Sequence, residues 1–199
     1  MPPSKIPDNP RRVLVADDEH LVVAGICNHL KALGMEVVGP FSDGQSALDS
    51  CGSQPPDLAI LDIRMPVMDG LDAAQRLWDS RRIPSIIVSA YGDESYVERA
   101  RKTGIFSFVI KPVNAEILRA AIGVAWSRFL DHHAECERVE QLELTIAQRR
   151  TIEQAKWKLV ETKRMTEAEA HAYLQKSARN DRRRLIDVAE ELLGIKKPG

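Results

Sequence analysis

The feature that most constrains the fold is a fivefold alternation of short apolar runs with amphipathic stretches over about residues 11–125. Short apolar runs rich in β-branched residues are typical of buried strands. The stretches between them have apolar residues at helical spacing, and Asp43, Asp69 and Asp93 lie where a carboxylate favours a helix N-terminus. This alternation predicts an α/β fold, a doubly wound sheet of five parallel strands with helices on both faces. The expected strands are 12–16, 36–39, 57–61, 84–89 and 106–110.

The chain changes character after Pro112, because only Gly123 and no proline interrupts the following eighty residues. Asn114 can cap a long helix that begins near Ala115. An apolar stripe then follows steps of three and four, which is typical of a coiled-coil seam. We interpret residues 126–150 as a coiled-coil linker helix that pairs two copies of the chain; the alternative is a single helix that lies on its own domain. The stripe consists of Ile122, Trp126, Phe129, His133, Cys136, Val139, Leu142 and Ile146.

The last part, residues 142–199, reads as a small all-α domain of three helices whose first helix continues the coiled coil. Thr166 and Glu169 have the spacing of a capping box, in which each side chain bonds the other residue's backbone amide. The final helix is expected to begin at Asn180 or Asp181 and to end at Gly194.

Five polar residues follow or end four of the expected strands: Asp17 and Asp18 the first, Asp62 the third, Ser89 the fourth and Lys111 the fifth. Ligands of open parallel sheets bind beyond the carboxyl ends of the strands. Three carboxylates there repel one another unless a hard cation joins them, and Mg²⁺ prefers oxygen ligands and phosphate. Together these groups suit phosphoryl transfer onto an aspartate. Any one aspartate taken alone is more simply a turn or capping residue.

Four motifs resemble the receiver domain of two-component response regulators: VLVADDE, LDIRMPVMDG, VSAYGD and FVIKP. The resemblance covers about residues 11–125 and implies a flavodoxin-like fold. It implies that Asp62 accepts the phosphoryl group from a sensor histidine kinase. It also implies a Mg²⁺ site formed by Asp17, Asp18, Asp62 and the backbone carbonyl of Arg64.

The same resemblance assigns roles to three further residues. Ser89 would contact the phosphoryl oxygens, Lys111 would pair with them, and Phe108 occupies the aromatic switch position of the last strand. The peptide bond between Lys111 and Pro112 is expected to be cis. The only chemistry implied is self-catalysed phosphorylation and slow dephosphorylation of the aspartate, so we do not expect a metabolic enzyme.

Charge divides the chain unevenly. Residues 1–144 carry 15 basic and 21 acidic residues, whereas residues 145–199 carry 13 basic and 8 acidic ones. A basic tail suggests an anionic partner, although a solvated helix face would account for the charge equally well. If the helices fold back on one another, two basic groups could form one surface for phosphates. They are Arg149, Arg150, Lys156, Lys158, Lys163 and Arg164, and Arg179, Arg182, Arg183 and Arg184.

Three functions compete for this tail: an RNA-binding antiterminator, a DNA-binding transcriptional regulator, and a protein-interaction adaptor that acts through the coiled coil. Residues 142–193 resemble the ANTAR domain, an RNA-binding module of transcription antitermination regulators. One departure is Trp157, which stands where that family usually has a small residue. The matching positions are Ala155, Lys156, Leu159, Ala170, Tyr173, Leu174, Ala178, Leu185, Val188 and Ala189.

The ANTAR resemblance implies dimers that bind paired stem-loops in nascent transcripts and favour antitermination. We expect phosphorylation of Asp62 to shift Ser89 and Phe108, to change the pairing of the seam, and so to present two tails to two RNA loops. Lys156, Arg179 and Arg183 are our candidates for RNA contact.

The sequence predicts a cytoplasmic protein without a membrane segment. There is no apolar run of the roughly 18 residues that spanning needs, and the N-terminus lacks an apolar signal region. Three widely spaced cysteines suit reduced thiols rather than a disulfide framework. Residues 1–10, with three prolines among the first seven, are expected to be a disordered lead.

Overall fold

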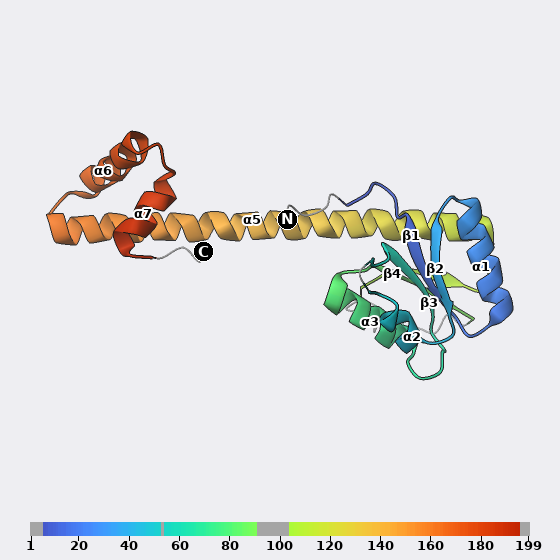
Figure 1. Ribbon diagram of the computed structural model, residues 1–199. Coiled ribbons are helices and arrows are strands. Elements are labelled where there is room, and N and C mark those ends of the chain that lie inside the picture. The colour runs from blue at the N-terminus through green and yellow to red at the C-terminus, as the bar shows by residue number, and fades with distance from the viewer. Residues whose placement is uncertain (1–5, 53, 91–103, 196–199) are drawn as a thin grey trace. The chain divides into compact units, whose positions relative to one another are not determined.

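The structure is a computed structural model that describes residues 6–52, 54–90 and 104–195 (Figure 1). It divides the chain into two compact units, Met1–His132 and His133–Gly199. The helix expected after Asp93 lies outside the described residues, apart from its last position at Gly104. Within the described ranges, no helix is both long and apolar enough to cross a membrane.

A sheet of five parallel strands forms the centre of the first unit, in the order β2-β1-β3-β4-β5. The order reverses at β1, which makes the sheet doubly wound, and the predicted flavodoxin-like fold is confirmed. Each strand begins and ends within two residues of its predicted position. The strands are β1 Arg12–Ala16, β2 Glu36–Phe41, β3 Leu58–Asp62, β4 Ser85–Ser89 and β5 Ile105–Ile110.

Helices cover both faces of this sheet. Successive side chains of a strand point to opposite faces, so the apolar strands present apolar side chains on both. Val13 and Val15 of β1 pack with α1 (His20–Ala32) and with the first turns of α5 (Ala115–Lys163). Leu14 and Ala16 pack with α2 (Gly44–Asp49) and α3 (Gly70–Arg81) on the opposite face. Figure 1 shows α2 and α3 together on one side of the sheet and α1 on the other.

Side-chain caps fix where three helices begin. Asp43 accepts a hydrogen bond from the backbone N–H of Ser46 at the start of α2, and Asp69 accepts one from Asp72 at the start of α3. Asn114 accepts one from the N–H of Ile117 at 2.8 Å, which starts α5 at Ala115 as predicted. These contacts supply partners for amides that the first turn of a helix leaves unpaired.

The predicted disordered lead is wrong for residues 6–10. Pro10 is buried, and the carbonyl of Pro7 accepts a hydrogen bond from the indole N–H of Trp126 at 3.2 Å. The segment is held because it supplies the partner that a buried indole needs. Residues 1–5 of the lead lie outside the described residues.

The start of the predicted coiled-coil seam is also wrong. Ile122, Trp126 and Phe129 are at most 7% exposed and belong to the first unit, where Phe129 packs edge-on against Phe106 of β5. A stripe with steps of three and four looks the same whether it faces its own domain or another chain. In the second unit the stripe is open: Val139, Leu142 and Ile146 are 45%, 57% and 51% exposed.

The second unit contains the later turns of α5, α6 (Glu167–Asn180) and α7 (Leu185–Leu193), so the small three-helix domain is confirmed. Its core consists of Ala155, Leu159, Ala170, Leu174 and Ala189.

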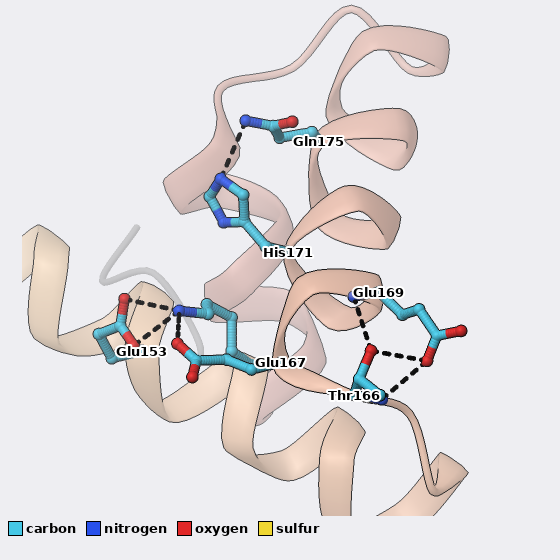
Figure 2. Close-up of polar contacts among 7 residues, drawn as sticks. Glu153, Thr166, Glu167, Glu169, His171 and Gln175 are labelled. Carbon is cyan, nitrogen blue, oxygen red and sulfur yellow. Dashed lines mark hydrogen bonds and ion pairs between the residues drawn. The ribbon is translucent and has the colours of Figure 1, made fainter.

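The caps of α6 and α7 differ in how well the sequence predicted them. The predicted capping box is present, since Thr166 Oγ1 accepts from the N–H of Glu169 and the Glu169 carboxylate accepts from the N–H of Thr166 (Figure 2). The predicted start of the last helix is wrong. Asn180 is the last residue of α6 and Asp181 its C-cap, so α7 begins only at Leu185.

Candidate functional site

Three carboxylates meet at the carboxyl ends of β1 and β3. Asp17 follows β1 and Asp62 ends β3, and these strands are neighbours with Ala16 opposite Leu61. One carboxylate oxygen from each of Asp17, Asp18 and Asp62 lies within 4.8 Å of the others. Asp17 and Asp62 are buried, whereas Asp18 is exposed. The predicted gathering of these side chains is thus seen in the structure.

Lys111, which follows β5, joins this cluster. Its Nζ lies 2.9 Å from Asp17 Oδ2, 2.9 Å from Asp62 Oδ1 and 2.7 Å from Glu19 Oε1. Glu19 is a site residue that our sequence reasoning missed. The available signal was a third acidic residue directly after the acidic pair.

Burial and charge shift the ionisation of these groups in defined directions. Burial raises the pKa of Asp17, and the nearby Asp62 charge adds to this, although contacts with Lys111 and the Glu19 amide oppose it. Burial alone would lower the pKa of Lys111, but its contacts with Glu19, Asp62 and Asp17 outweigh burial and raise it. Lys111 is therefore a permanent cation at neutral pH.

The donor set fits a hard divalent cation. The Lys111 ammonium pairs with three carboxylates, from Asp17, Glu19 and Asp62, and Asp18 adds a fourth carboxylate beside Asp17 and Asp62. The cluster therefore has an excess of negative charge. Asp17 Oδ2 is buried, and its polar partner among the described residues is the Lys111 ammonium group at 2.9 Å. All-oxygen clusters of this kind suit Mg²⁺. Arg64, the other predicted ligand, donates its backbone N–H to Asp62 Oδ2 at 2.7 Å.

Ser89 and Phe108 lie on the adjoining strands. Ser89 ends β4 and is 5% exposed, and its carbonyl accepts a hydrogen bond from the N–H of Lys111 at 2.8 Å. Phe108 is half-buried in β5 and packs against the core between the sheet and α2 and α3. The peptide bond between Lys111 and Pro112 is cis, as predicted.

The backbone packs tightly behind Asp62. A Cβ atom added to Gly70 at the start of α3 would lie 1.9 Å from the carbonyl oxygen of Asp62. The N–H of Gly70 bonds the carbonyl of Ile63 at 3.0 Å. Only glycine fits here, so α3 holds the end of β3 in a fixed position.

In the second unit, Lys156 forms ion pairs within the domain. It is 7% exposed, and its Nζ lies 2.9 Å from Glu153 on its own helix and 2.7 Å from Glu167 at the start of α6. The contacts with Glu167 and Glu153 raise the pKa of Lys156. Figure 2 shows Glu153 and Glu167 converging from the two helices. Lys156 thus joins α5 to α6, whereas we had predicted it to contact RNA.

Four more basic side chains also have partners inside the unit. Lys158 Nζ donates to the carbonyl of Leu192 at 2.8 Å, and Lys163 Nζ lies 4.2 Å above the Tyr173 ring. Arg183 pairs with Glu191, and Arg184 pairs with Asp187 at 2.9 Å. Five arginines of the two predicted basic groups are exposed and form no ion pair with the described residues: Arg149, Arg150, Arg164, Arg179 and Arg182.

Both units match known families. The response regulator receiver domain matches residues 13–123, and the ANTAR domain matches residues 140–193. Among curated proteins, the chain is similar to the transcriptional regulatory protein PdtaR of Mycobacterium tuberculosis. The two are 36% identical over 191 residues, which cover 94% of this chain and 93% of the relative.

Solved structures match the first unit. The receiver domain of a modulated diguanylate cyclase from Desulfovibrio desulfuricans is 30% identical with a TM-score of 0.57, covering 63% of this chain and 99% of that one. The receiver domain of a putative response regulator NarL from Mycobacterium tuberculosis is 32% identical with a TM-score of 0.54, covering 59% and 97%. From its two domain matches and a relative of nearly the same length, the chain belongs to the ANTAR family of response regulators.

Proposed function

We propose that this response regulator binds stem-loop RNA in nascent transcripts and favours antitermination when Asp62 is phosphorylated. The observation that carries the proposal is the joining, in one chain, of an aspartate–lysine cluster at strand ends with a basic ANTAR domain. Nascent transcripts are cytoplasmic in a bacterium, which is where we propose that the protein acts.

A sensor histidine kinase is the proposed phosphodonor, and Asp62 the acceptor. Mg²⁺, when bound by Asp17, Asp18, Asp62 and the carbonyl of Arg64, would neutralise charge on the incoming phosphoryl group. Lys111 already lies 2.9 Å from Asp62 and would exchange that carboxylate for phosphoryl oxygens. Ser89 would donate its hydroxyl to them, and Phe108 would move with it.

The proposed output depends on α5, to which both units contribute residues. Movement of β5 and the first turns of α5 would change how two copies pair along the open stripe from His133 to Ile146. Half-exposed Val139, Leu142 and Ile146 support a partner helix there, because apolar side chains at this spacing are costly to leave in water. A dimer presents two RNA-binding units, and bivalent binding raises affinity without new contacts.

Among the predicted RNA contacts, Arg179 has the best support because it is exposed near the end of α6. Lys156 and Arg183 are engaged by Glu153 and Glu167, and by Glu191. DNA is the weaker alternative. A helix-turn-helix protein reads bases from the start of its second helix, whereas Arg182 and Arg183 lie in the turn before α7.

The experiment compares binding of the full chain to a two-stem-loop RNA and to duplex DNA of equal length. It is done with and without a small-molecule phosphodonor plus Mg²⁺, at two salt concentrations. We expect a phosphorylation-dependent preference for RNA that persists at the higher salt. Equal, salt-sensitive binding to both would contradict the proposal and reduce the tail to a nonspecific basic patch. Specific binding to neither would favour a protein partner at the open stripe.

A further inference from the structure

Trp157 is an exposed aromatic residue that the second unit does not use in its core. Its side chain is 58% exposed, whereas Trp126 is 4% exposed in the first unit. No ring or cation among the described residues stacks on it, and it is not part of the core of Ala155, Leu159 and their neighbours. An exposed indole offers a flat aromatic ring on which a planar ligand can stack.

Trp157 forms one end of a shallow strip along α5. The strip is lined by Ile146, Arg149, Arg150, Glu153, Gln154 and Trp157. Glu153 is the one acidic residue of the strip; it pairs with Lys156 at 2.9 Å, and the two guanidinium groups outnumber it. The strip therefore combines one flat aromatic face with two uncompensated guanidinium groups, which together suit an anionic, aromatic ligand.

Charge argues that a second copy of the chain does not cover this strip. In a symmetric parallel helix pair, equivalent residues face each other. Arg150 lies four residues after Ile146 and seven before Trp157, so a seam continued to Trp157 would bring two copies of Arg150 together. Like charges at such close range are unfavourable, so the pairing stripe ends at Ile146.

We propose that Trp157, with Arg149 and Arg150, forms a stacking site for one unpaired base of an RNA loop, whose phosphates lie against the two guanidinium groups. The inference rests on the RNA-binding function proposed above. Bases in a loop are free to stack on an aromatic side chain or an arginine, whereas bases in a duplex are stacked on each other.

The test starts with full-length wild-type protein, treated with phosphodonor and Mg²⁺, and a pool of stem-loop RNAs with randomised loops. Affinity for the enriched RNA is then compared for Trp157→Ala, Trp157→Phe and a matched control, Leu144→Ala. Leu144 is a 50% exposed apolar residue of the same helix that does not line the strip. We expect Trp157→Ala to bind about tenfold more weakly. Trp157→Phe retains an aromatic ring and should stay within about threefold of wild type, and Leu144→Ala within about twofold.

Two further measurements separate stacking from other roles. Base stacking should quench the Trp157 fluorescence, taken as the difference between wild type and Trp157→Phe, when RNA is added. Arg150→Ala should lower the slope of log affinity against log salt by about 0.7, the value for one contact with single-stranded phosphate.

The outcomes separate failure of the site from failure of the proposed function. Failure of the wild-type chain to enrich any RNA would overturn both. Enrichment followed by equal affinity of Trp157→Ala would overturn the stacking site alone and leave RNA binding intact. A loss of dimer in sedimentation for Trp157→Ala, with fluorescence that depends on protein concentration rather than RNA, would assign the strip to a second copy instead.

Discussion

Lys111 in the first unit and Lys156 in the second are the same residue in superficially the same situation. Each is nearly buried, and each ammonium group is held by two or more carboxylates at 2.7–3.0 Å. Their partners differ. Asp17 and Asp62 beside Lys111 have side chains 1% and 7% exposed, whereas Glu153 and Glu167 beside Lys156 are 55% and 64% exposed.

This difference shows which ion cluster is suited to chemistry. At Lys111 two of the anions, Asp17 and Asp62, are buried and share one cation, so the site has an excess of buried negative charge that a metal ion could balance. At Lys156 the anions are hydrated, and the lysine completes a contact between α5 and α6 with no such excess.

The largest expected effect is a complete loss of phosphorylation. Asp62→Asn removes the carboxylate that we expect to accept the phosphoryl group, so intact-mass measurement after treatment with phosphodonor and Mg²⁺ should show no phosphorylated protein. Asp49→Asn, an exposed residue at the end of α2, should be phosphorylated like wild type. Continued phosphorylation of Asp62→Asn at the wild-type rate would place the acceptor elsewhere. The Lys111 cluster would then not be the site of phosphorylation.

The next effect tests how rigidly the first site is built. Gly70→Ala forces a methyl group against the Asp62 carbonyl, 1.9 Å away, and should lower the free energy of unfolding by about 3 kcal/mol. Urea unfolding gives the value. The matched control is Gly25→Ala inside α1, where the added Cβ meets nothing within 4 Å and the change should stabilise by about 1 kcal/mol. Equal stability of the two variants would show that α3 can move away from β3.

A smaller effect is expected for Asp17→Asn, which should raise the free energy of unfolding where Gly70→Ala lowers it. Because burial raises the pKa of Asp17 above the ordinary 3.8, the folded state binds the carboxyl proton more tightly than the unfolded state does. The stability this group contributes is complete below pH 3.8 and is lost as pH rises through the raised folded-state pKa. Asp17→Asn should therefore unfold at higher urea concentration than wild type at pH 7 with chelator present. The gain should be about 1 kcal/mol, because Lys111 keeps the carboxylates of Asp62 and Glu19 and is not left as an uncompensated buried charge.

The stability gain of Asp17→Asn should shrink as the pH is lowered toward 3.8, because the wild-type carboxyl takes up its proton at a higher pH in the folded state than in the unfolded state. Added Mg²⁺ should also reduce the difference in stability between Asp17→Asn and wild type, because only wild type gains stability from binding the ion. A variant less stable than wild type at pH 7 would mean that the Lys111 pair outweighs the cost of burying Asp17.

The sequence predicted that Asp17, Asp62 and Lys111 lie together because they sit at strand ends, and parallel strands bring those ends to the same edge of the sheet. Glu19 was missed because nothing local shows that its side chain contacts Lys111, 92 residues away. The seam was misplaced at Ile122 and Trp126 for a related reason. Helical spacing of apolar residues predicts that one face of a helix is covered, but it does not show whether the chain's own domain or another chain covers it.

The second unit was harder to predict at the level of single side chains. Glu153 precedes Lys156 by three residues, a pairing visible in the sequence, but the contact with Glu167 exists only once α6 docks. Asn180 and Asp181 are good N-caps, yet the chain uses them to end α6. The basic residues could be counted from the sequence, whereas the structure was needed to show which of them have partners.

The smallest expected effect tests whether Lys156 serves only to join α5 to α6. Lys156→Met keeps the length and the apolar stem of a buried side chain, and it leaves Glu153 and Glu167 exposed enough to be hydrated. RNA affinity should stay within about twofold of wild type, and the salt slope should not change, since no phosphate contact is lost. Circular dichroism should confirm that the variant is folded, and Arg150→Ala serves as the comparison. A drop in slope of about 0.7 for Lys156→Met would mean that Lys156 leaves its two glutamates to bind phosphate, so that it, like Lys111, serves a ligand.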